Sequence, residues 1–256
     1  MIAILMYHRV CEPKLSDPRP GLCVSPEVFD AQLREIAARG YRFVTFAELA
    51  ERTPKGKLAV LTFDDGTEDN YHEAFPILKR HGASATVFVV TGLLGRPNAY
   101  AGSAVDGGHT ILTSSQVAEM AAAGIEFGSH TCTHRSLPSL SDEELERELS
   151  ESRRSLAAIV QREVLAIAYP YGHRDARVLA ATGRAGYRFG CTTNRGRNSD
   201  LSASLLLKRI PMRNGIRGAR LRYRLSRWYD LEHRLRRRRH RTTKTARSAP
   251  EDRDRR

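Results

Sequence analysis

Long apolar runs are missing from this 256-residue sequence. No stretch approaches the ~20 apolar residues that a membrane-spanning helix requires. Residues 1–6 are apolar, but they are few, have no basic segment before them and lead directly into Tyr7, His8 and Arg9, unlike a secretory signal. The sequence therefore predicts a cytoplasmic protein without a membrane span, and peripheral association with the inner membrane surface is left open.

Cysteine is also scarce, and the chain contains only Cys11, Cys23, Cys132 and Cys191. No two of them form a CxxC pair, which argues against a zinc ribbon and against a thioredoxin-like redox site. A chain of this length buries enough apolar surface to fold without disulfides. We therefore expect reduced cysteines, and Cys11 and Cys23 are the only pair close enough in sequence to question that expectation.

Acidic residues are in short supply at the C-terminal end. Residues 217–256 contain 16 Lys and Arg against 5 Asp and Glu, whereas residues 1–216 contain 26 against 24, so most of the net charge of +13 lies in the tail. Four apolar residues lie among these arginines at intervals typical of one side of a helix: Leu221, Leu225, Trp228 and Leu235. This pattern predicts a helix packed on the body, followed by a partly disordered end. The alternative is a basic anchor for an anionic membrane surface or polymer. No specific nucleic-acid partner is predicted.

About eight short apolar segments alternate with helical patterns in residues 1–216, which is typical of an α/β domain with parallel strands. Polar residues follow directly after four of these segments, at His8, Asp64-Asp65, His130 and Pro170-Tyr171. In a β/α barrel the C-terminal strand ends meet on one face, where active sites lie. An open doubly wound sheet would gather such residues mainly at its switch point, so the pattern favours a barrel. We predict a single catalytic domain over 1–216 and a basic tail over 217–256.

Two adjacent carboxylates, Asp64 and Asp65, end the predicted strand at 57–63 and precede Gly66. Neighbouring side chains of an extended strand point in different directions, and glycine lets the backbone turn sharply. The two carboxylates can therefore take separate roles, one binding a cation and the other handling a proton. An isolated sequence of this kind is more often a polar turn, so a second motif has to support the functional interpretation.

His130 and His134 provide that second motif. On a helical turn this spacing places both imidazoles on one face, within reach of one cation. With Asp65 they make a set of two nitrogens and one oxygen, which is how catalytic zinc is held with one position open. Cys132 lies between the histidines, but in a helical segment its side chain would point away from theirs, so it is not expected to be a ligand.

Three segments in this order, Thr62–Gly66, Ser129–His134 and Tyr169–Gly172, resemble the polysaccharide deacetylase family, also known as carbohydrate esterase family 4 or the nodulation-B homology domain. The segments Leu5–His8 and Leu207–Ile210 are similar to the branch that deacetylates polymers like poly-N-acetylglucosamine. The resemblance implies a deformed β/α barrel of about seven units that lacks a regular eighth unit.

The same resemblance implies a divalent metal, usually zinc, held by Asp65, His130 and His134. It also implies that Asp64 is the general base and that the backbone N–H of Tyr171 helps to form the oxyanion site. These roles are chemically consistent. A bound metal polarises a carbonyl and lowers the pKa of water, a carboxylate can accept the proton of that water, and a backbone donor stabilises the developing oxyanion.

The sequence departs from the family pattern at two places. Ala168 stands where many members have an arginine that steadies the catalytic aspartate, and Leu207-Lys208-Arg209 stands where a Leu-x-His motif supplies the acid in others. The support of Asp64 and the acid are therefore not assigned by the pattern. His8 is our candidate for the acid because it ends the first strand on the predicted catalytic face, and a supporting structural role is the alternative.

Substrate contacts are expected from Tyr7, Pro170 and Tyr171, where either tyrosine could stack on a sugar ring or simply pack. We predict a zinc-dependent hydrolase that removes N-acetyl groups from a poly- or oligosaccharide containing N-acetylglucosamine. The alternatives are an O-acetyl esterase, a hydrolase of another amide, and a non-catalytic protein that binds carbohydrate or an anionic polymer. The last is disfavoured because a binding module has no need for two aspartates and two histidines arranged in this way.

Overall fold

The structure is a computed structural model that describes residues 1–13, 19–52, 55–98 and 109–247, with side chains described as far as residue 237. The strands are β1 (Ile2–Tyr7), β2 (Arg9–Val10), β3 (Cys23–Val24), β4 (Tyr41–Phe43), β5 (Lys57–Phe63), β6 (Ala85–Val89), β7 (Glu126–Ser129), β8 (Ala166–Ala168), β9 (Phe189–Arg195) and β10 (Leu207–Pro211). The α-helices are α1 (Pro26–Ala38), α2 (Phe46–Glu51), α3 (Phe75–His81), α4 (Ser114–Ala122), α5 (Asp142–Val160), α6 (Ala176–Arg184), α7 (Gly218–Arg224) and α8 (Arg227–Arg247).

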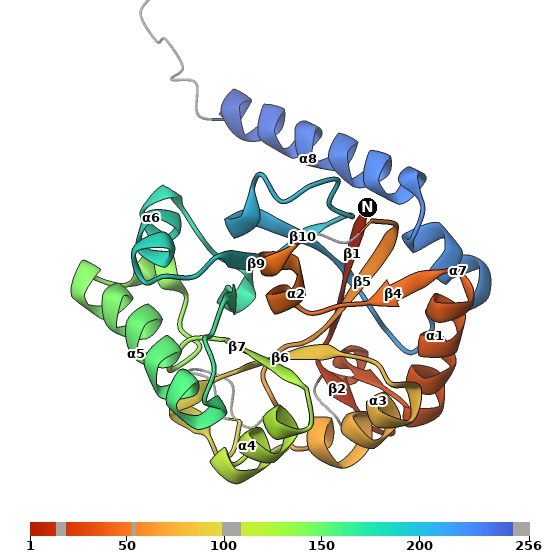
Figure 1. Cartoon of the computed structure of the whole chain (residues 1–256). Helices are drawn as coiled ribbons and strands as arrows, with labels where there is room; N and C mark the ends of the chain where they lie inside the picture. Colours follow the sequence, from red (N-terminus) through yellow and green to blue (C-terminus); the bar gives the residue numbers. More distant parts are fainter. Residues whose placement is uncertain (14–18, 53–54, 99–108, 248–256) are drawn as a thin grey trace, which may run out of the picture.

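Parallel strands form a closed barrel surrounded by helices (Figure 1). The order runs β1-β10-β9-β8-β7-β6-β5, and β5 pairs with β1 to complete the ring, with Leu5 opposite Leu61 on one side and Ile210 on the other. β4 pairs with β5 outside this ring. The described residues thus place seven strands in the barrel and no regular eighth, which confirms the predicted deformed barrel of about seven units.

Several helices begin where the sequence places capping residues. Thr45, Thr113 and Ser141 each accept a hydrogen bond from the backbone three residues later, and the acidic or amide side chain there returns one, so each forms a capping box. Ser25 caps α1, with Pro26 at its first position. These local signals fix the starts of the helices independently of the barrel.

The strands are apolar on both sides because they separate two packed layers. Ile2 and Ile4 belong to the cluster inside the barrel, whereas Ala3, Leu5 and Tyr7 pack outward against helices such as α1. Neighbouring side chains in a strand point to opposite faces, so this register decides which residues of β1 can reach the interior. Complete burial of an aliphatic or aromatic side chain stabilises the fold by about 1.5–3 kcal/mol.

One end of the barrel interior is filled by α2, which lies in the middle of the ring of strands in Figure 1. Its Phe46 ring lies 6.1 Å from the ring of Phe88 and 5.3 Å from that of Phe189. The carboxylate of Glu126, the first residue of β7, accepts hydrogen bonds from the backbone of Phe46 and Ala47. This end is therefore the N-terminal end of the strands, and their C-terminal end is left for the polar residues.

The C-terminal segment contains two helices. The predicted boundary between 216 and 217 lies just before α7, and Leu221 and Leu225 are buried against the body. Trp228 and Leu235 lie on α8, beyond a break between the helices, and are exposed. The apolar positions predicted as one helical stripe are therefore divided: two are buried at α7 and two are on the exposed side of α8. Residues 248–256 lie outside the described part of the chain.

Cys11 and Cys23 are joined by a disulfide. The expectation of reduced cysteines is therefore wrong for this pair. The parallel pairing of β2 with β3 brings the two residues together, with Arg9 opposite Cys23 and Val10 opposite Val24. Cys132 and Cys191 are free. No helix among the described residues is both long and apolar enough to cross a membrane.

Candidate active site and metal centre

Asp64 and Asp65 follow β5 at the C-terminal end of the barrel, where the chain turns sharply. Asp65 has a φ of 75° and Gly66 a φ of 72°, both in the left-handed region. A Cβ atom on Gly66 would lie 2.8 Å from Cγ2 of Val89, so the turn is both left-handed and closely packed. The turn separates the two carboxylates, as the sequence predicted, and lets each face different partners.

The predicted ligands Asp65, His130 and His134 meet at this turn. One ligand atom from each lies within 4.8 Å of the other two, and all three residues are buried. Oδ1 of Asp65 is 3.5 Å from Nε2 of His130 and 3.7 Å from Nε2 of His134. Two imidazole nitrogens and one carboxylate oxygen converging on a single point are a donor set suited to a divalent metal such as zinc.

The loop after β7 brings the histidines together without forming a helix. Thr131 and His134 adopt left-handed φ angles of 69° and 59°. The helical turn that we used to explain the spacing of His130 and His134 is therefore wrong, although the two rings do converge. Cys132 remains outside the ligand cluster, with its Sγ 3.8 Å from the carbonyl oxygen of Glu148.

The conformation of this loop is held by Glu148 of α5. One carboxylate oxygen accepts hydrogen bonds from the backbone N–H groups of Cys132 (2.8 Å) and Thr133 (2.9 Å), and the other accepts one from the Thr133 hydroxyl. Glu148 is buried. Nothing in the sequence distinguishes Glu148, because it lies on a charged helix with several other glutamates.

The two histidines differ in protonation. Nδ1 of His130 donates to the carbonyl oxygen of Ala168 at 2.6 Å, so Nε2 is the nitrogen that faces Asp65. Burial lowers the pKa of His130, but the hydrogen bond to Asp65 and the charges of Asp64 and Asp65 outweigh burial and raise the pKa, so a metal would bind Nε2 after its proton leaves. Burial, followed by the charge of His130, lowers the pKa of His134 to about 3. Its ring is therefore neutral near pH 7, which is the form that binds a metal.

Asp64 is held by a buried arginine from β10, which is separated from β5 by β1 in the barrel. Arg209 of β10 donates from its two terminal nitrogens to Oδ1 and Oδ2 of Asp64, at 2.6 and 2.8 Å. Its Nε donates to the carbonyl oxygen of Thr192. Burial raises the pKa of Asp64, but the charge of Arg209, that of His130 and the bidentate hydrogen bonds outweigh it and hold the pKa below its usual value. Asp64 is therefore ionised at neutral pH and can accept a proton.

His8 follows β1 and lies beside Asp64, with Nε2 3.9 Å from Oδ2. About one fifth of its side chain is exposed. Burial lowers the pKa of His8 more than the nearby Asp64 and Asp65 raise it. The structure thus brings the candidate acid to the catalytic face as a mostly neutral imidazole.

A small cavity of about 110 Å³ opens onto these groups. Its lining includes His8, both aspartates, both histidines and Tyr171. Tyr171 has a φ of 58°, is 47% exposed, and its ring centre lies 4.7 Å from that of His134. Pro170 is buried in the preceding turn and is not among the lining residues.

Tyr7 does not reach the cavity. Its ring is fully buried between Phe29 and Phe63, and its hydroxyl donates to Oε1 of Gln32 at 3.0 Å. The strand alternation of β1 directs Tyr7 outward to the helices, while the preceding residue, Met6, lines the cavity. The prediction that Tyr7 contacts the substrate is therefore wrong.

Comparison with known proteins agrees with this geometry. Residues 51–190 match the sequence pattern of the family described as polysaccharide deacetylase. The chain belongs to the polysaccharide deacetylase family. It is 30% identical over 223 residues to the putative polysaccharide deacetylase YxkH of Bacillus subtilis, a match that covers 85% of this chain and 74% of that protein.

Two further relatives are informative. The poly-β-1,6-N-acetyl-D-glucosamine N-deacetylase of Staphylococcus aureus is 27% identical over 209 residues, covering 73% of this chain and 70% of its own. The solved structure of the Streptococcus pyogenes deacetylase PplD in complex with acetate superimposes with a TM-score of 0.75 at 33% identity, covering 88% of this chain and 98% of that one. The fold of this family member is thus shared over 88% of its chain with a deacetylase of known structure.

Arg209 supports Asp64 in this chain, a part that the family pattern does not assign. Ala168 offers only its carbonyl oxygen, to His130, and cannot pair with Asp64. The guanidinium that does so comes from Leu207-Lys208-Arg209, the segment that stands in place of a Leu-x-His motif. The alternation of β10 was the available signal, because Arg209 shares the inward face with Leu207 and a buried arginine requires a buried anion.

Proposed function

We propose that this chain is a zinc-dependent hydrolase that removes N-acetyl groups from a poly- or oligosaccharide containing N-acetylglucosamine. The convergence of Asp65, His130 and His134 beside an ionised Asp64 is the observation that carries the proposal. Family membership and the similarity to an N-deacetylase of poly-N-acetylglucosamine support the choice of reaction and of substrate. Zinc held by these three residues would polarise the acetyl carbonyl and lower the pKa of water.

The protein residues would divide the remaining work among them. Asp64 accepts the proton of the attacking water, and Arg209 keeps Asp64 ionised until that proton arrives. The backbone N–H of Tyr171 donates to the developing oxyanion, and the exposed ring of Tyr171 lies where it can contact the sugar. Pro170 contributes by shaping the turn that presents Tyr171.

His8 would deliver a proton to the leaving amine. Because burial lowers its pKa, His8 is mostly neutral before the reaction, so the proton that it delivers has to be taken up during the cycle. Asp64 is the nearest source, with 3.9 Å between Oδ2 and Nε2 of His8. Catalytic hydrogen bonds of this kind are often long before substrate binds and shorten in the complex.

Acetate release tests the proposal directly. The purified protein is depleted of metal, reloaded with zinc, and assayed on β-1,6-linked N-acetylglucosamine oligomers and on O-acetylated xylan. We expect acetate from the first substrate only, dependent on zinc, and none with Asp65→Asn at limiting zinc. Release from the O-acetylated polymer alone would identify an esterase, and oligomer binding without any acetate release would identify a binding protein.

The compartment remains a proposal as well. The disulfide between Cys11 and Cys23 argues against the cytoplasmic location expected from the sequence, because such bonds persist mainly in oxidising compartments. We therefore favour an oxidising compartment. Titrating thiols in the unreduced, denatured protein checks this: two reactive thiols support the disulfide, and four support the cytoplasmic prediction.

A further inference from the structure

The outer side of α8 carries an exposed apolar stripe, which we call the α8 stripe: Trp228, Leu231 and Leu235. These side chains are 58%, 37% and 48% exposed, respectively. Their spacing of three and four residues places them on one side of the helix. Tyr229 and His233, roughly half a turn away, are buried against the body. The helix is therefore fixed by one side. The α8 stripe is exposed, and its Trp228 ring is covered in part by the guanidinium of Arg227, whose carbon lies 5.1 Å from the ring centre.

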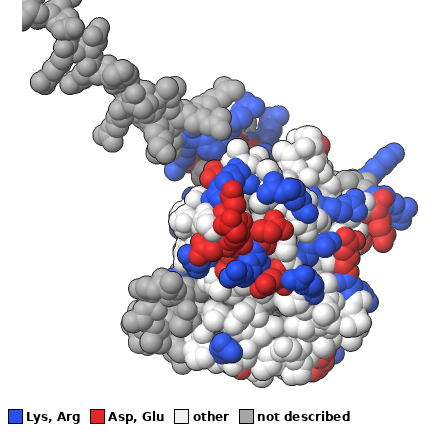
Figure 2. Space-filling view, turned by 90° about the vertical axis from the view of Figure 1, so that its left-hand side faces the viewer, with Lys and Arg blue, Asp and Glu red and all other residues white. Residues whose placement is uncertain are grey.

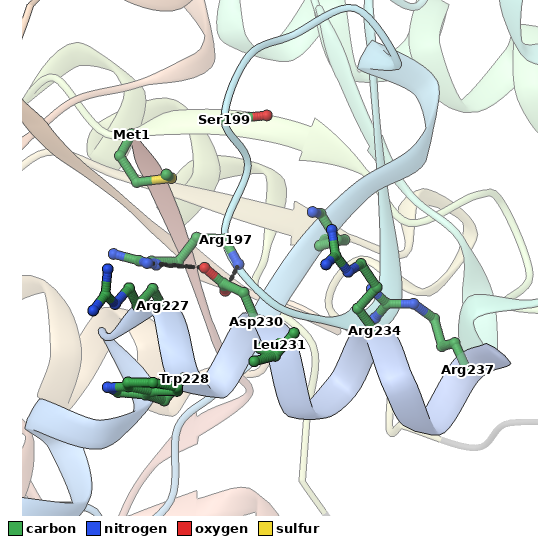
Figure 3. Close-up of a pocket in the computed structure, with 10 residues that line it drawn as sticks. Met1, Arg197, Ser199, Arg227, Trp228, Asp230, Leu231, Arg234 and Arg237 are labelled. Carbon is green, nitrogen blue, oxygen red and sulfur yellow. Dashed lines mark hydrogen bonds and ion pairs between the residues drawn. The ribbon is translucent and has the colours of Figure 1, made fainter. Parts of the chain in front are cut away.

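Positive charge flanks this stripe. A pocket of about 610 Å³ lies between α8 and the N-terminal end of β10, and the cations among its lining residues are Arg197, Lys208, Arg227, Arg234 and Arg237. Its one carboxylate, Asp230, accepts hydrogen bonds from the Arg197 guanidinium at 2.9 and 3.0 Å. Burial and then the charge of Arg237 lower the pKa of Lys208, as expected where cations are crowded. Trp228 and Leu231 of the stripe also line this pocket. In Figure 3, Arg227 and Arg234 project toward it from α8.

The face over α5 and α6 differs from the surface around α8. The face over α5 and α6 shows acidic and basic side chains intermingled (Figure 2). There, Arg135, Arg153 and Arg177 each pair with a carboxylate. Around α8, Asp230 pairs with Arg197 and Glu232 pairs with Arg236, and exposed apolar side chains adjoin the pocket cations.

We propose that α8 docks onto a bilayer that contains anionic phospholipids, with the α8 stripe inserted among the headgroups and the pocket cations binding phosphate. An interfacial helix presents a Trp- and Leu-containing face beside Arg or Lys, and this is the pattern seen here. A soluble polyanion would use the arginines but gives no role to three exposed apolar side chains, so the stripe favours the bilayer. This inference does not depend on the deacetylase activity.

Docking through α8 leaves the catalytic centre accessible. Lys208, which lines the pocket, is near the start of β10, and Met1, another lining residue, immediately precedes β1. His8 follows the other end of β1. The proposed membrane contact and the catalytic cavity are therefore at opposite ends of the same strands, and a polymer in solution could enter the cavity while the protein stays bound.

Co-sedimentation with vesicles tests the proposal on the full chain. We expect binding to vesicles of phosphatidylcholine with phosphatidylglycerol and little binding to phosphatidylcholine alone. Trp228→Ala combined with Leu235→Ala should weaken binding by roughly tenfold or more, because both side chains lose apolar burial. Arg227→Gln combined with Arg234→Gln should weaken it by about 30-fold, since each basic residue near an anionic surface contributes about fivefold.

A matched charge control uses Arg34→Gln combined with Arg80→Gln. Both arginines are exposed, Arg34 on α1 and Arg80 on α3. The double change removes two positive charges, the same number as the change in α8. This control should bind vesicles as the parent does, and all variants should keep the parent's circular dichroism and its activity on a short soluble substrate. Equal loss in the control would show nonspecific charge attraction and overturn the proposal. Unchanged binding of the Trp228/Leu235 variant, with displacement of the protein by soluble polyphosphate, would overturn it in favour of a polyanion.

Discussion

Replacing Glu148 by Gln should weaken zinc binding although Glu148 is not a ligand. Its carboxylate holds the backbone of Cys132 and Thr133, between the two histidine ligands. The residues on either side, Thr131 and His134, have left-handed backbone angles that cost about 1–3 kcal/mol each for non-glycine residues. Without a strong acceptor at this place, we expect the loop to relax and to move His134 away from Asp65.

The magnitude follows from the three hydrogen bonds. Bonds to a charged acceptor contribute about 1.5–3 kcal/mol each, against about 1 kcal/mol for neutral pairs. An amide oxygen can still accept both backbone N–H groups but lacks the charge, and the Thr133 hydroxyl loses its carboxylate acceptor. Even at the lower end of these values the three changes add to about 2.5 kcal/mol, which corresponds to about 70-fold weaker zinc binding if the loss appears mainly as disorder of the loop. This is near the 10- to 100-fold range found when residues that support metal ligands are changed.

Glu126→Gln is a matched control. Glu126 is also a glutamate that accepts two successive backbone N–H groups, from Phe46 and Ala47, and a threonine hydroxyl, from Thr86. It does so at the N-terminal end of the barrel, away from the metal centre. Both variants should lose comparable thermal stability without metal, measured by circular dichroism, but only Glu148→Gln should change the zinc Kd, measured by competition with a chelating indicator. A zinc Kd within threefold of the parent in folded Glu148→Gln would refute this reasoning, as would equal weakening in Glu126→Gln.

Three further predictions concern the catalytic residues. Asp65→Asn should lose zinc affinity in equilibrium dialysis, whereas Asp64→Asn should keep zinc and have almost no turnover; the opposite result would reverse the two roles. Arg209→Gln should move the acidic limb of the kcat/KM profile to higher pH, because burial then dominates the pKa of Asp64 and the required ionised form is lost sooner as pH falls. Arg209→Lys should give a smaller displacement, and an unmoved limb in both would remove Arg209 from this role. His8→Ala should lower kcat by roughly 10²- to 10⁴-fold with zinc content unchanged, and near-normal turnover would exclude His8 from proton transfer.

The sequence was informative where function depends on short segments. The barrel was predictable because apolar strands and capped helices alternate regularly, and Asp64, Asp65, His130 and His134 were found because each pair lies within a few residues. The structure brings all four to one end of the barrel. What the sequence did not reveal is the local backbone: the loop carrying the histidines is left-handed at two residues, and no side-chain spacing shows this.

The residues that were predicted wrongly or not identified each have a physical explanation. Tyr7 adjoins His8 in sequence, but strand alternation directs Tyr7 to the helical layer, so proximity to a motif was a poor guide. Glu148 was missed because a buried carboxylate on a charged helix looks like its exposed neighbours. The pairing of Cys11 and Cys23 depends on how the loop between them returns, which their separation in sequence does not determine.

The ion pair between Arg209 and Asp64 connects the proposed proton acceptor to the strand pairing that closes the barrel. Arg209 lies on β10 and Asp64 follows β5, and β1 stands between these strands and pairs with both. Arg209 faces the interior only in the observed register, in which Leu5 is opposite Ile210; a slip of one residue would turn the guanidinium outward and leave Asp64 buried without its counter-charge. Leaving one member of a buried pair alone costs about 3–5 kcal/mol. The ion pair therefore opposes such a slip, and the register that closes the barrel also keeps the proton acceptor ionised.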